Sequence, residues 1–196
     1  MAMASMLVIA SSNAGKVREF DHLLAALHLE IRPQPEGLEV EETGATFAEN
    51  ARLKATAVAR ATGCWALADD SGLSVSALGG APGVHSARYA TTDEARIGRL
   101  LRELAGTDDR SAQFTAALTV ADPSGAIRLE VEGICAGEIL EESRGTGGFG
   151  YDPVFFVPEE GLTYAEMDKQ LKGRIGHRGK AFALLAPQLR ALLGAG

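Results

Sequence analysis

The sequence has few cysteines, no long apolar run and no excess of positive charge. Its two cysteines, Cys64 and Cys135, lie far apart among apolar residues and lack the spacing of a metal site. We therefore expect buried, reduced thiols and a cytoplasmic protein. The opening residues contain no basic stretch, so we also expect no secretory signal.

The longest segment without Asp, Glu, Lys or Arg covers residues 71–87. Its glycines, proline and histidine are not typical of a transmembrane helix, so we expect no membrane as partner. The formal net charge of −7 argues against a nucleic acid polymer or an anionic membrane surface. A small polyanion could still bind, provided that a divalent cation neutralises the acidic residues around it.

The length and composition of the chain are typical of a globular protein. The chain has 196 residues, of which 46% are hydrophobic and 23% are charged. This length fits a single domain over residues 1–196, or one domain with two lobes. Such a chain buries a substantial core without metal or disulfide crosslinks.

The pattern of apolar residues predicts alternating strands and helices, followed by an antiparallel pair. The expected strands are 7–10, 64–68, 113–121, 127–137 and 154–157. The expected helices are 17–27, 46–61, 93–105 and 178–193, and Pro187 either kinks the last one or starts a second. Residues 33–45 read as an irregular acidic loop. We predict an α/β fold: an elongated mixed β-sheet flanked by helices, with two lobes and a central active-site cleft.

Polar clusters follow several predicted strands, where ligands bind in open α/β sheets. The first cluster, residues 11–16, precedes a helix whose first N–H groups attract anions. It is not a P-loop, because it lacks the first glycine and the final Ser or Thr. Two simpler interpretations stay open: Asn13 as a helix N-cap, and Lys16 as a solvated lysine.

Asp69 and Asp70 form the second cluster, and adjacent carboxylates repel each other unless something holds them. Because strand side chains alternate, we expect only one of them to face the cleft. Mg²⁺ binds one or two carboxylates together with water and phosphate oxygens, so it suits this position. Nearby glutamates are further candidate ligands, although solvent exposure is the default for each: Glu36, Glu39, Glu41, Glu42 and Glu49. Glu49 already fits a capping box with Thr46.

Residues 145–153 read Gly-Thr-Gly-Gly-Phe-Gly-Tyr-Asp-Pro, a backbone that can approach a ligand closely. Phe149 and Tyr151 offer flat rings on which a planar ligand can stack, and Asp152 adds an acceptor. The alternative is a mobile surface loop whose rings tuck inward.

His177 and Arg178 lie near a predicted helix N-terminus, where the helix dipole disfavours cations. Their position suggests a nearby acceptor, either a phosphate or an exocyclic oxygen of a base. The alternative is that Arg178 pairs with a surface glutamate.

Six segments together resemble the inosine triphosphate pyrophosphatase family, the Ham1-type enzymes that act on non-standard purine nucleotides. They are residues 12–16, 41–51, 68–73, 79–89, 145–155 and 177–181. Each short motif is weak by itself, but the set occurs in the family's order over nearly the whole chain.

The resemblance implies a homodimeric enzyme that uses Mg²⁺ to hydrolyse dITP, ITP and XTP to the monophosphate and pyrophosphate. This reaction would remove such nucleotides from the nucleotide pool. By the same resemblance, the triphosphate is held by Ser11, Ser12, Asn13, Ala14, Gly15 and Lys16. Glu41 and Asp70 bind the metal, and Asp70 also positions or deprotonates the attacking water.

The resemblance also assigns the remaining substrate contacts. Ser71 contacts the substrate and Phe149 stacks on the base. Gly150, Tyr151 and Asp152 close around the base, while Lys172, His177 and Arg178 contact the purine edge.

The chain departs from the family pattern at Gly176, where Ser is common, and at Ser11, where Thr is common. Gly176 removes a hydroxyl near the base, which bears on selectivity and not on the reaction. Two other functions stay open: a pyrophosphatase for modified pyrimidine nucleotides, and a nucleotide-binding sensor without hydrolysis.

Overall fold

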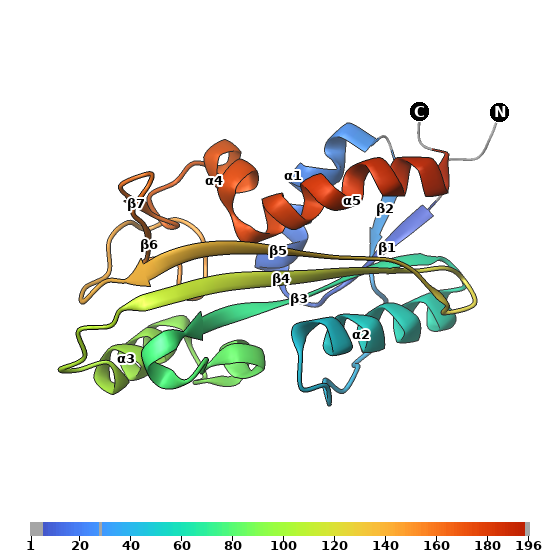
Figure 1. Cartoon of the computed structure of the whole chain (residues 1–196). Helices are drawn as coiled ribbons and strands as arrows, with labels where there is room; N and C mark the ends of the chain where they lie inside the picture. Colours follow the sequence, from blue (N-terminus) through green and yellow to red (C-terminus); the bar gives the residue numbers. More distant parts are fainter. Residues whose placement is uncertain (1–5, 28, 195–196) are drawn as a thin grey trace. The chain divides into compact units, whose positions relative to one another are not determined.

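The computed structural model describes residues 6–27 and 29–194. Within them a seven-stranded sheet has the order β2-β1-β3-β4-β5-β6-β7 (Figure 1). The strands are β1 (Met6–Ala10), β2 (Glu30–Pro33), β3 (Trp65–Val75), β4 (Ser111–Ala121), β5 (Ile127–Ile139), β6 (Phe155–Val157) and β7 (Leu162–Thr163). The helices are α1 (Ala14–Leu24), α2 (Phe47–Thr62), α3 (Asp93–Glu103), α4 (Lys169–Ile175) and α5 (His177–Leu193). None of the helices in the described residues is long and apolar enough to cross a membrane.

The sheet is mixed, as the sequence predicts. Strand β1 pairs in parallel with β2 and β3, whereas β6 pairs antiparallel with β5 and β7. Parallel pairing of β1 with β3 requires a crossover, and α2 lies in the segment that connects them.

The contacts within the chain divide it into two compact units, each with its own core. Unit 1 comprises the described parts of Met1–Asp70, Ala116–Gly133 and Arg178–Gly196, and unit 2 comprises Ser71–Thr115 and Ile134–His177. Strands β3, β4 and β5 contribute residues to both units.

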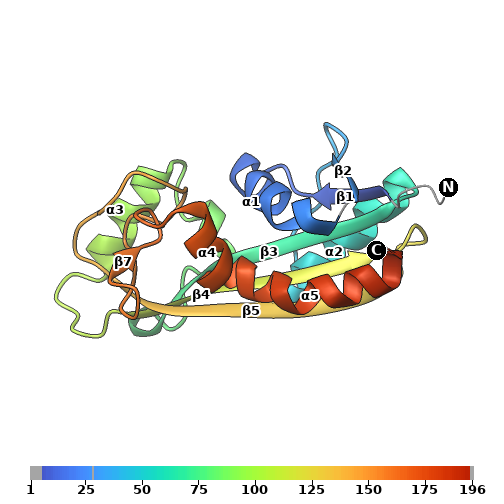
Figure 2. The same ribbon diagram turned by 90° about the horizontal axis from the view of Figure 1, so that it is seen from above.

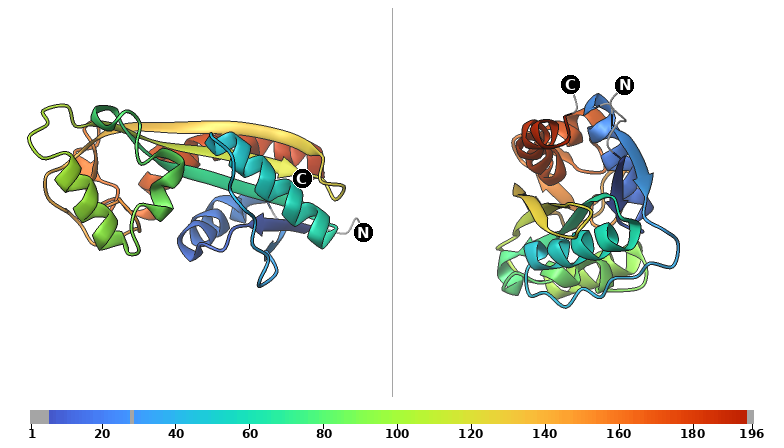
Figure 3. Two further views of the ribbon diagram at one scale, coloured as in Figure 1. Left: turned by 90° about the horizontal axis from the view of Figure 1, so that it is seen from below. Right: turned by 90° about the vertical axis from the view of Figure 1, so that its right-hand side faces the viewer.

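In unit 1, the alternation of strand side chains explains why helices cover both faces of the strands. Leu7 and Ile9 of β1 pack with apolar residues of α1 and α5. Val8 and Ala10 point the other way and pack with α2. Figures 1 and 3 show α5 and α2 on opposite sides of these strands.

The core of unit 2 contains more aromatic side chains. The edge of the Phe155 ring meets both Phe114 and Tyr164, with ring centroids 4.7 and 4.8 Å apart. These side chains come from β4, β6 and the residue after β7, so they join the strands to the segment before α4. Helices α3 and α4, which are labelled in Figure 2, belong to this unit.

Most predicted elements are confirmed, but β2, β7 and α4 are missing from the prediction. The predicted end of the strand at residue 68 is wrong: β3 continues to Val75, so Asp69 and Asp70 lie inside it. The last helix is a single one that contains Pro187, which rules out the second helix. Cys64 and Cys135 form no disulfide in the described residues, but only Cys135 is buried, whereas Cys64 is half-buried.

The start of α2 shows why its prediction succeeds. The Thr46 side chain accepts a hydrogen bond from the Glu49 N–H at 3.2 Å, and Glu49 Oε2 accepts one from the Thr46 N–H at 3.2 Å. This capping box satisfies N–H groups that have no partner within the helix.

We expect Thr46→Ala to lower the free energy of unfolding by about 1 kcal/mol, because the Glu49 N–H loses its acceptor. Urea denaturation followed by circular dichroism measures the change. Thr46→Ser keeps the hydroxyl and serves as the matched control. Equal stability of the Ala variant and the original chain would contradict the prediction.

Candidate active site

The first polar centre, in unit 1, is the carboxylate of Asp69. Its side chain is 0% exposed and lies 2.9 Å from Lys16 Nζ and 3.3 Å from Arg178 Nε. Burial alone would raise the pKa of this carboxyl, but Arg178 and Lys16 outweigh burial and hold the pKa well below its usual range. Asp69 is therefore ionised and joins β3 to α1 and α5.

Lys16 does not behave as a solvated lysine. Its side chain is only 14% exposed. Burial lowers the pKa of Lys16, and Asp69 partly opposes that shift. An ammonium that is already largely buried and lies next to the start of α1 is well suited to bind a phosphate group.

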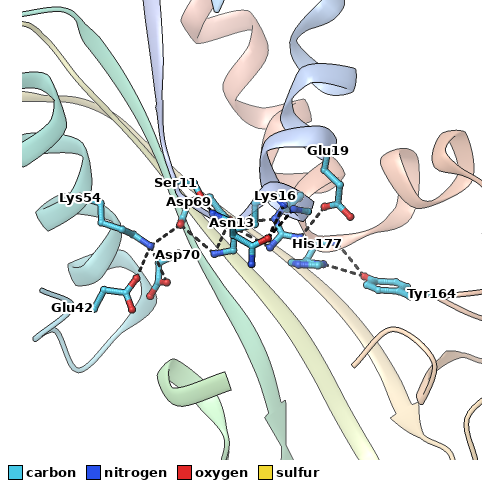
Figure 4. Close-up of polar contacts among 12 residues, drawn as sticks. Ser11, Asn13, Lys16, Glu19, Glu42, Lys54, Asp69, Asp70, Tyr164 and His177 are labelled. Atoms are coloured by element: carbon cyan, nitrogen blue, oxygen red, sulfur yellow. Dashed lines mark hydrogen bonds and ion pairs between the residues drawn. The ribbon is translucent and has the colours of Figure 1, made fainter. Parts of the chain in front are cut away.

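Asp70, the next residue of β3, has different neighbours from Asp69. Lys54 of α2 donates to Asp70 Oδ1 at 3.2 Å, to Glu42 Oε1 at 2.8 Å and to the Asp69 carbonyl at 2.8 Å. Figure 4 shows Lys54 between Glu42 and Asp70. The side chains of Asp69 and Asp70 thus have different ion-pair partners. That only one of them faces a cleft stays a prediction.

One oxygen of Asp70 has no hydrogen-bond partner among the described residues. This atom, Oδ2, is buried. Burial raises the pKa of Asp70, although Lys54 and Lys16 oppose the shift. A buried carboxylate oxygen without a donor is costly unless a ligand binds it, so Asp70 is suited to hold a cation or a water molecule.

The cluster at residues 11–16 forms the turn before α1. Asn13 Oδ1 accepts from the N–H groups of Gly15 and Lys16 at 2.9 and 3.2 Å, so Asn13 is the N-cap of the helix. Ser11 Oγ accepts from the Asn13 N–H at 3.2 Å. Ser12 and Ala14 are exposed and Gly15 is buried.

Arg178 lies among carboxylates. In unit 1 its guanidinium donates to Asp69 Oδ2 and, at 2.8 Å, to Glu19 Oε2 of α1. The side chain is 7% exposed. The predicted alternative that Arg178 pairs with a glutamate is therefore present. Arg178 also forms a buried ion pair with Asp69.

The second polar centre, in unit 2, lies at the glycine-rich loop. Asp152 is 3% exposed, and its Oδ2 accepts from the Phe149 N–H at 3.0 Å and from Lys172 Nζ at 2.7 Å. Gly148 has a φ of 74°, and a Cβ at this position would overlap the Asp152 carboxylate. Only glycine therefore allows the loop to close on Asp152.

The two rings of this loop differ in their surroundings. Tyr151 is 4% exposed, packs in the core of unit 2 and donates to the Ser86 carbonyl at 2.9 Å. Phe149 is half-buried, and Lys172 Nζ lies 5.2 Å from its ring centroid. The alternative that the rings of this loop tuck inward is thus correct for Tyr151, whereas Phe149 is the ring better placed for stacking.

His177 completes the second centre. It is 3% exposed and is the first residue of α5. Its ring lies 4.8 Å from Phe114, at an angle of 16° between the planes. Its Nδ1 lies 3.3 Å from the hydroxyl of Tyr164.

The sequence of the chain, compared with models of known protein families, gives a clear match. The model of the Ham1 family matches residues 7–188. The chain belongs to the Ham1 family.

Relatives of this Ham1 chain align along nearly its whole length. A protein of Parasynechococcus marenigrum (strain WH8102) named dITP/XTP pyrophosphatase is 64% identical over 96% of this chain and 97% of its own. One of Nostoc sp. (strain PCC 7120 / SAG 25.82 / UTEX 2576), with the same name, is 58% identical over 97% of each chain.

Solved structures also match the fold. A HAM1 protein from Coxiella burnetii superposes with a TM-score of 0.87 at 44% identity, covering 95% of this chain and 99% of its own. The Staphylococcus aureus Ham1 protein gives a TM-score of 0.84 at 41% identity, covering 96% and 100%.

The structure groups the predicted site residues by unit. Unit 1 joins Lys16 and Arg178 through Asp69, and it places Asp70 beside Lys54. Unit 2 contains Ser71, which is half-buried, and joins Phe149 and Lys172 through Asp152.

The predicted metal ligand Glu41 is exposed, whereas its neighbour Glu42 shares Lys54 with Asp70. No group of three or more His, Cys, Asp or Glu side chains in the described residues is arranged to hold a metal ion. Any cation at Asp70 therefore needs further ligands from substrate or water.

Glu19, Lys54 and Asp93, which belong to the centres described above, are absent from the sequence prediction. Lys54 is one of several charged residues of α2. Its sequence position gives one hint, because it lies beside the buried stripe formed by Ala51, Ala55 and Val58. Asp93, the first residue of α3, accepts the Gly150 N–H at 2.7 Å. No sequence signal connects it with a loop 57 residues away.

Gly176 separates α4 from α5 and is buried. Its N–H donates to the Lys172 carbonyl at 2.9 Å, and a Cβ built on it would lie 2.5 Å from that same oxygen. A side chain here must therefore displace the end of α4, which carries Lys172.

We expect Gly176→Ala to lower the free energy of unfolding by about 1–3 kcal/mol, because the added methyl group meets backbone and not a flexible side chain. Gly98→Ala is the matched control, since its Cβ would meet only the Arg102 side chain at 3.4 Å in the interior of α3. The control should be neutral or stabilising by up to about 1 kcal/mol. Urea denaturation of both variants measures the change in the free energy of unfolding. An unchanged free energy for Gly176→Ala would contradict the predicted clash.

Proposed function

We propose that this chain hydrolyses the non-standard purine nucleotides dITP, ITP and XTP to the monophosphate and pyrophosphate. The printed name of its relatives, dITP/XTP pyrophosphatase, supports this reaction. The observation that carries the proposal is the charge arrangement of unit 1, where Asp70, beside Lys54, keeps a buried oxygen to which no group of the described residues donates a hydrogen bond. The Asp70 carboxylate can therefore bind a cation or the water molecule that attacks the phosphoanhydride of a bound nucleotide.

We also propose Mg²⁺ as cofactor. In the described cluster, the cations Lys16, Lys54 and Arg178 face the carboxylates Glu19, Glu42, Asp69 and Asp70. The carboxylates outnumber the cations, so a triphosphate would meet net negative charge unless a divalent cation accompanied it. Asp70 and Glu42, which share one ammonium, are the carboxylates that fit such a cation; Glu41 remains a further candidate ligand.

When bound, Mg²⁺ neutralises phosphate charge and orients the phosphorus for in-line attack. The protein groups have separable tasks in this proposal. Asp70 holds the attacking water and accepts its proton, a task favoured by a raised carboxyl pKa. Lys16 and the first turn of α1 stabilise charge on the leaving pyrophosphate.

Base recognition is assigned to unit 2. Phe149 offers a half-buried ring for stacking, with the Lys172 ammonium over it. Gly150 and Asp152 fix the loop that carries this ring. Homodimer formation and a cytoplasmic location are part of the same proposal; light scattering of the purified protein and cell fractionation test them.

The reaction is tested by incubating the protein with Mg²⁺ and a panel of triphosphates: dITP, ITP, XTP, dATP, dGTP and modified pyrimidine nucleotides. We expect pyrophosphate and monophosphate from the first three, and loss of turnover on addition of EDTA. Release of orthophosphate alone would indicate a phosphatase. Preference for the pyrimidines would support the alternative enzyme, and binding without turnover would support a sensor.

We expect Asp70→Asn to lower kcat by at least about a hundredfold, because an amide cannot accept the proton and is a poorer ligand for a cation. The variant keeps the shape of the side chain and an acceptor for Lys54, so its circular dichroism and melting curve should stay native-like. Asp108→Asn, an exposed carboxylate before β4, is the control and should keep full activity. Activity of Asp70→Asn close to that of the control would remove Asp70 from the mechanism.

A further inference from the structure

A buried tyrosine in unit 2 contacts His177 at two atoms. Tyr164, which directly follows β7, is 1% exposed. Its hydroxyl oxygen accepts the backbone N–H of His177 at 3.2 Å and lies 3.3 Å from Nδ1 of the same residue (Figure 4). One hydroxyl thus fixes both the backbone and the ring of His177.

The plane of the His177 ring is fixed by stacking. Phe114 lies nearly parallel to His177 and to Tyr164, at interplanar angles of 16° and 9° and centroid distances of 4.8 and 5.4 Å. Tyr164 and His177 are themselves within 10° of parallel. The stack thus fixes the plane of the imidazole. Within that plane, a flip would turn a carbon-bound hydrogen toward the Tyr164 hydroxyl and lose the contact at Nδ1, so that contact selects the orientation.

The partners of the Tyr164 hydroxyl favour one position for the imidazole hydrogen. Burial raises the pKa of Tyr164 far above its usual value, so the phenol keeps its hydrogen. One lone pair of the oxygen already accepts the His177 N–H. The hydroxyl can donate to Nδ1 or to the nearby Cys135 sulfur, and sulfur is the weaker acceptor. Donation to Nδ1 leaves the hydrogen of the neutral imidazole on Nε2.

We propose that Tyr164 is a positioning residue that holds His177 in its Nε2–H tautomer, so that His177 offers a hydrogen-bond donor to the purine edge. This inference rests on the proposed function and deepens it. A donor fits the 6-oxo group of hypoxanthine and xanthine, but it opposes the 6-amino group of adenine. Guanine shares the 6-oxo group, so other contacts must discriminate against dGTP.

The contacts of Arg178 favour His177 for this task. Arg178 donates to two carboxylates of unit 1, Asp69 and Glu19. His177 belongs to unit 2, together with Phe149 and Lys172.

The test has a spectroscopic part that needs no substrate. In the ¹⁵N-histidine-labelled native protein, the His177 signals, assigned by their loss in His177→Gln, should show a protonated Nε2 and an unprotonated Nδ1. In Tyr164→Phe, which keeps the ring, we expect these signals to shift toward a mixture of both tautomers. A protonated Nδ1 in the native protein overturns the proposal, even if the variant does not fold.

The kinetic part compares dITP with dATP. For Tyr164→Phe we expect the ratio of kcat/KM for dITP to that for dATP to fall about tenfold, the value of one well-made hydrogen bond. The loss should appear mainly in KM for dITP, with kcat changed by less than about twofold. Unchanged histidine signals and an unchanged ratio would show that Tyr164 does not set the tautomer.

Tyr89→Phe is the matched control in the same unit. It also removes a tyrosine hydroxyl, one that donates to Glu103 of α3, and it should leave the His177 signals and the substrate ratio unchanged. If the native protein hydrolyses no purine triphosphate, the proposed function fails, while the nitrogen spectra still decide the tautomer.

Discussion

The buried carboxylate of Asp69 is the constraint on which the first polar centre depends. A fully buried charge is very costly without compensation, and Lys16 and Arg178 supply it from α1 and α5. Losing either cation would leave the charge undercompensated, so the carboxylate fixes where both helices start relative to β3. This accounts for the burial of Lys16, whose side chain is only 14% exposed: its position is set by an ion pair and not by the turn alone.

Asp70, the next residue of the same strand, has surroundings that differ from those of Asp69. Period-two alternation gives the two carboxylates separate partners, so one strand supplies a structural charge and the carboxylate to which we assign the chemistry in the proposed function. Asp69 is compensated by two cations, whereas Asp70 has one ammonium, which it shares with Glu42. The raised pKa of Asp70 is the consequence of that weaker compensation under burial. Repulsion between neighbouring carboxylates is thus reduced because cations from different elements face each of them.

Local signals made the helices and the separation of the aspartates predictable, because a capping box and a two-residue period involve only near neighbours in the sequence. The extension of β3 through Asp69 and Asp70 could not be predicted in the same way. Charged residues usually end an apolar strand, and the cations that permit them here lie at residues 16, 54 and 178. For a similar reason Lys54 looks like any exposed helical lysine until the fold places it beside Asp70. The order of motifs along the chain indicated the family, but not that Tyr151 packs inward while Phe149 stays half-buried.

The two polar centres differ in the physics that supports them. In unit 1 the arrangement depends on net charges, whose interactions are strong and tolerate small displacements. In unit 2 the ion pair of Asp152 with Lys172 is joined by a set of stacked rings and, in the inference above, by the position of a single hydrogen, which tolerate little displacement. The aromatic core of that unit suits this need, since Phe114, Phe155 and Tyr164 leave the His177 ring one stacked orientation. Gly176, directly before His177, adds a backbone contact too close for any Cβ. Selectivity for the base should therefore respond to packing changes in unit 2 that leave the charges of unit 1 untouched.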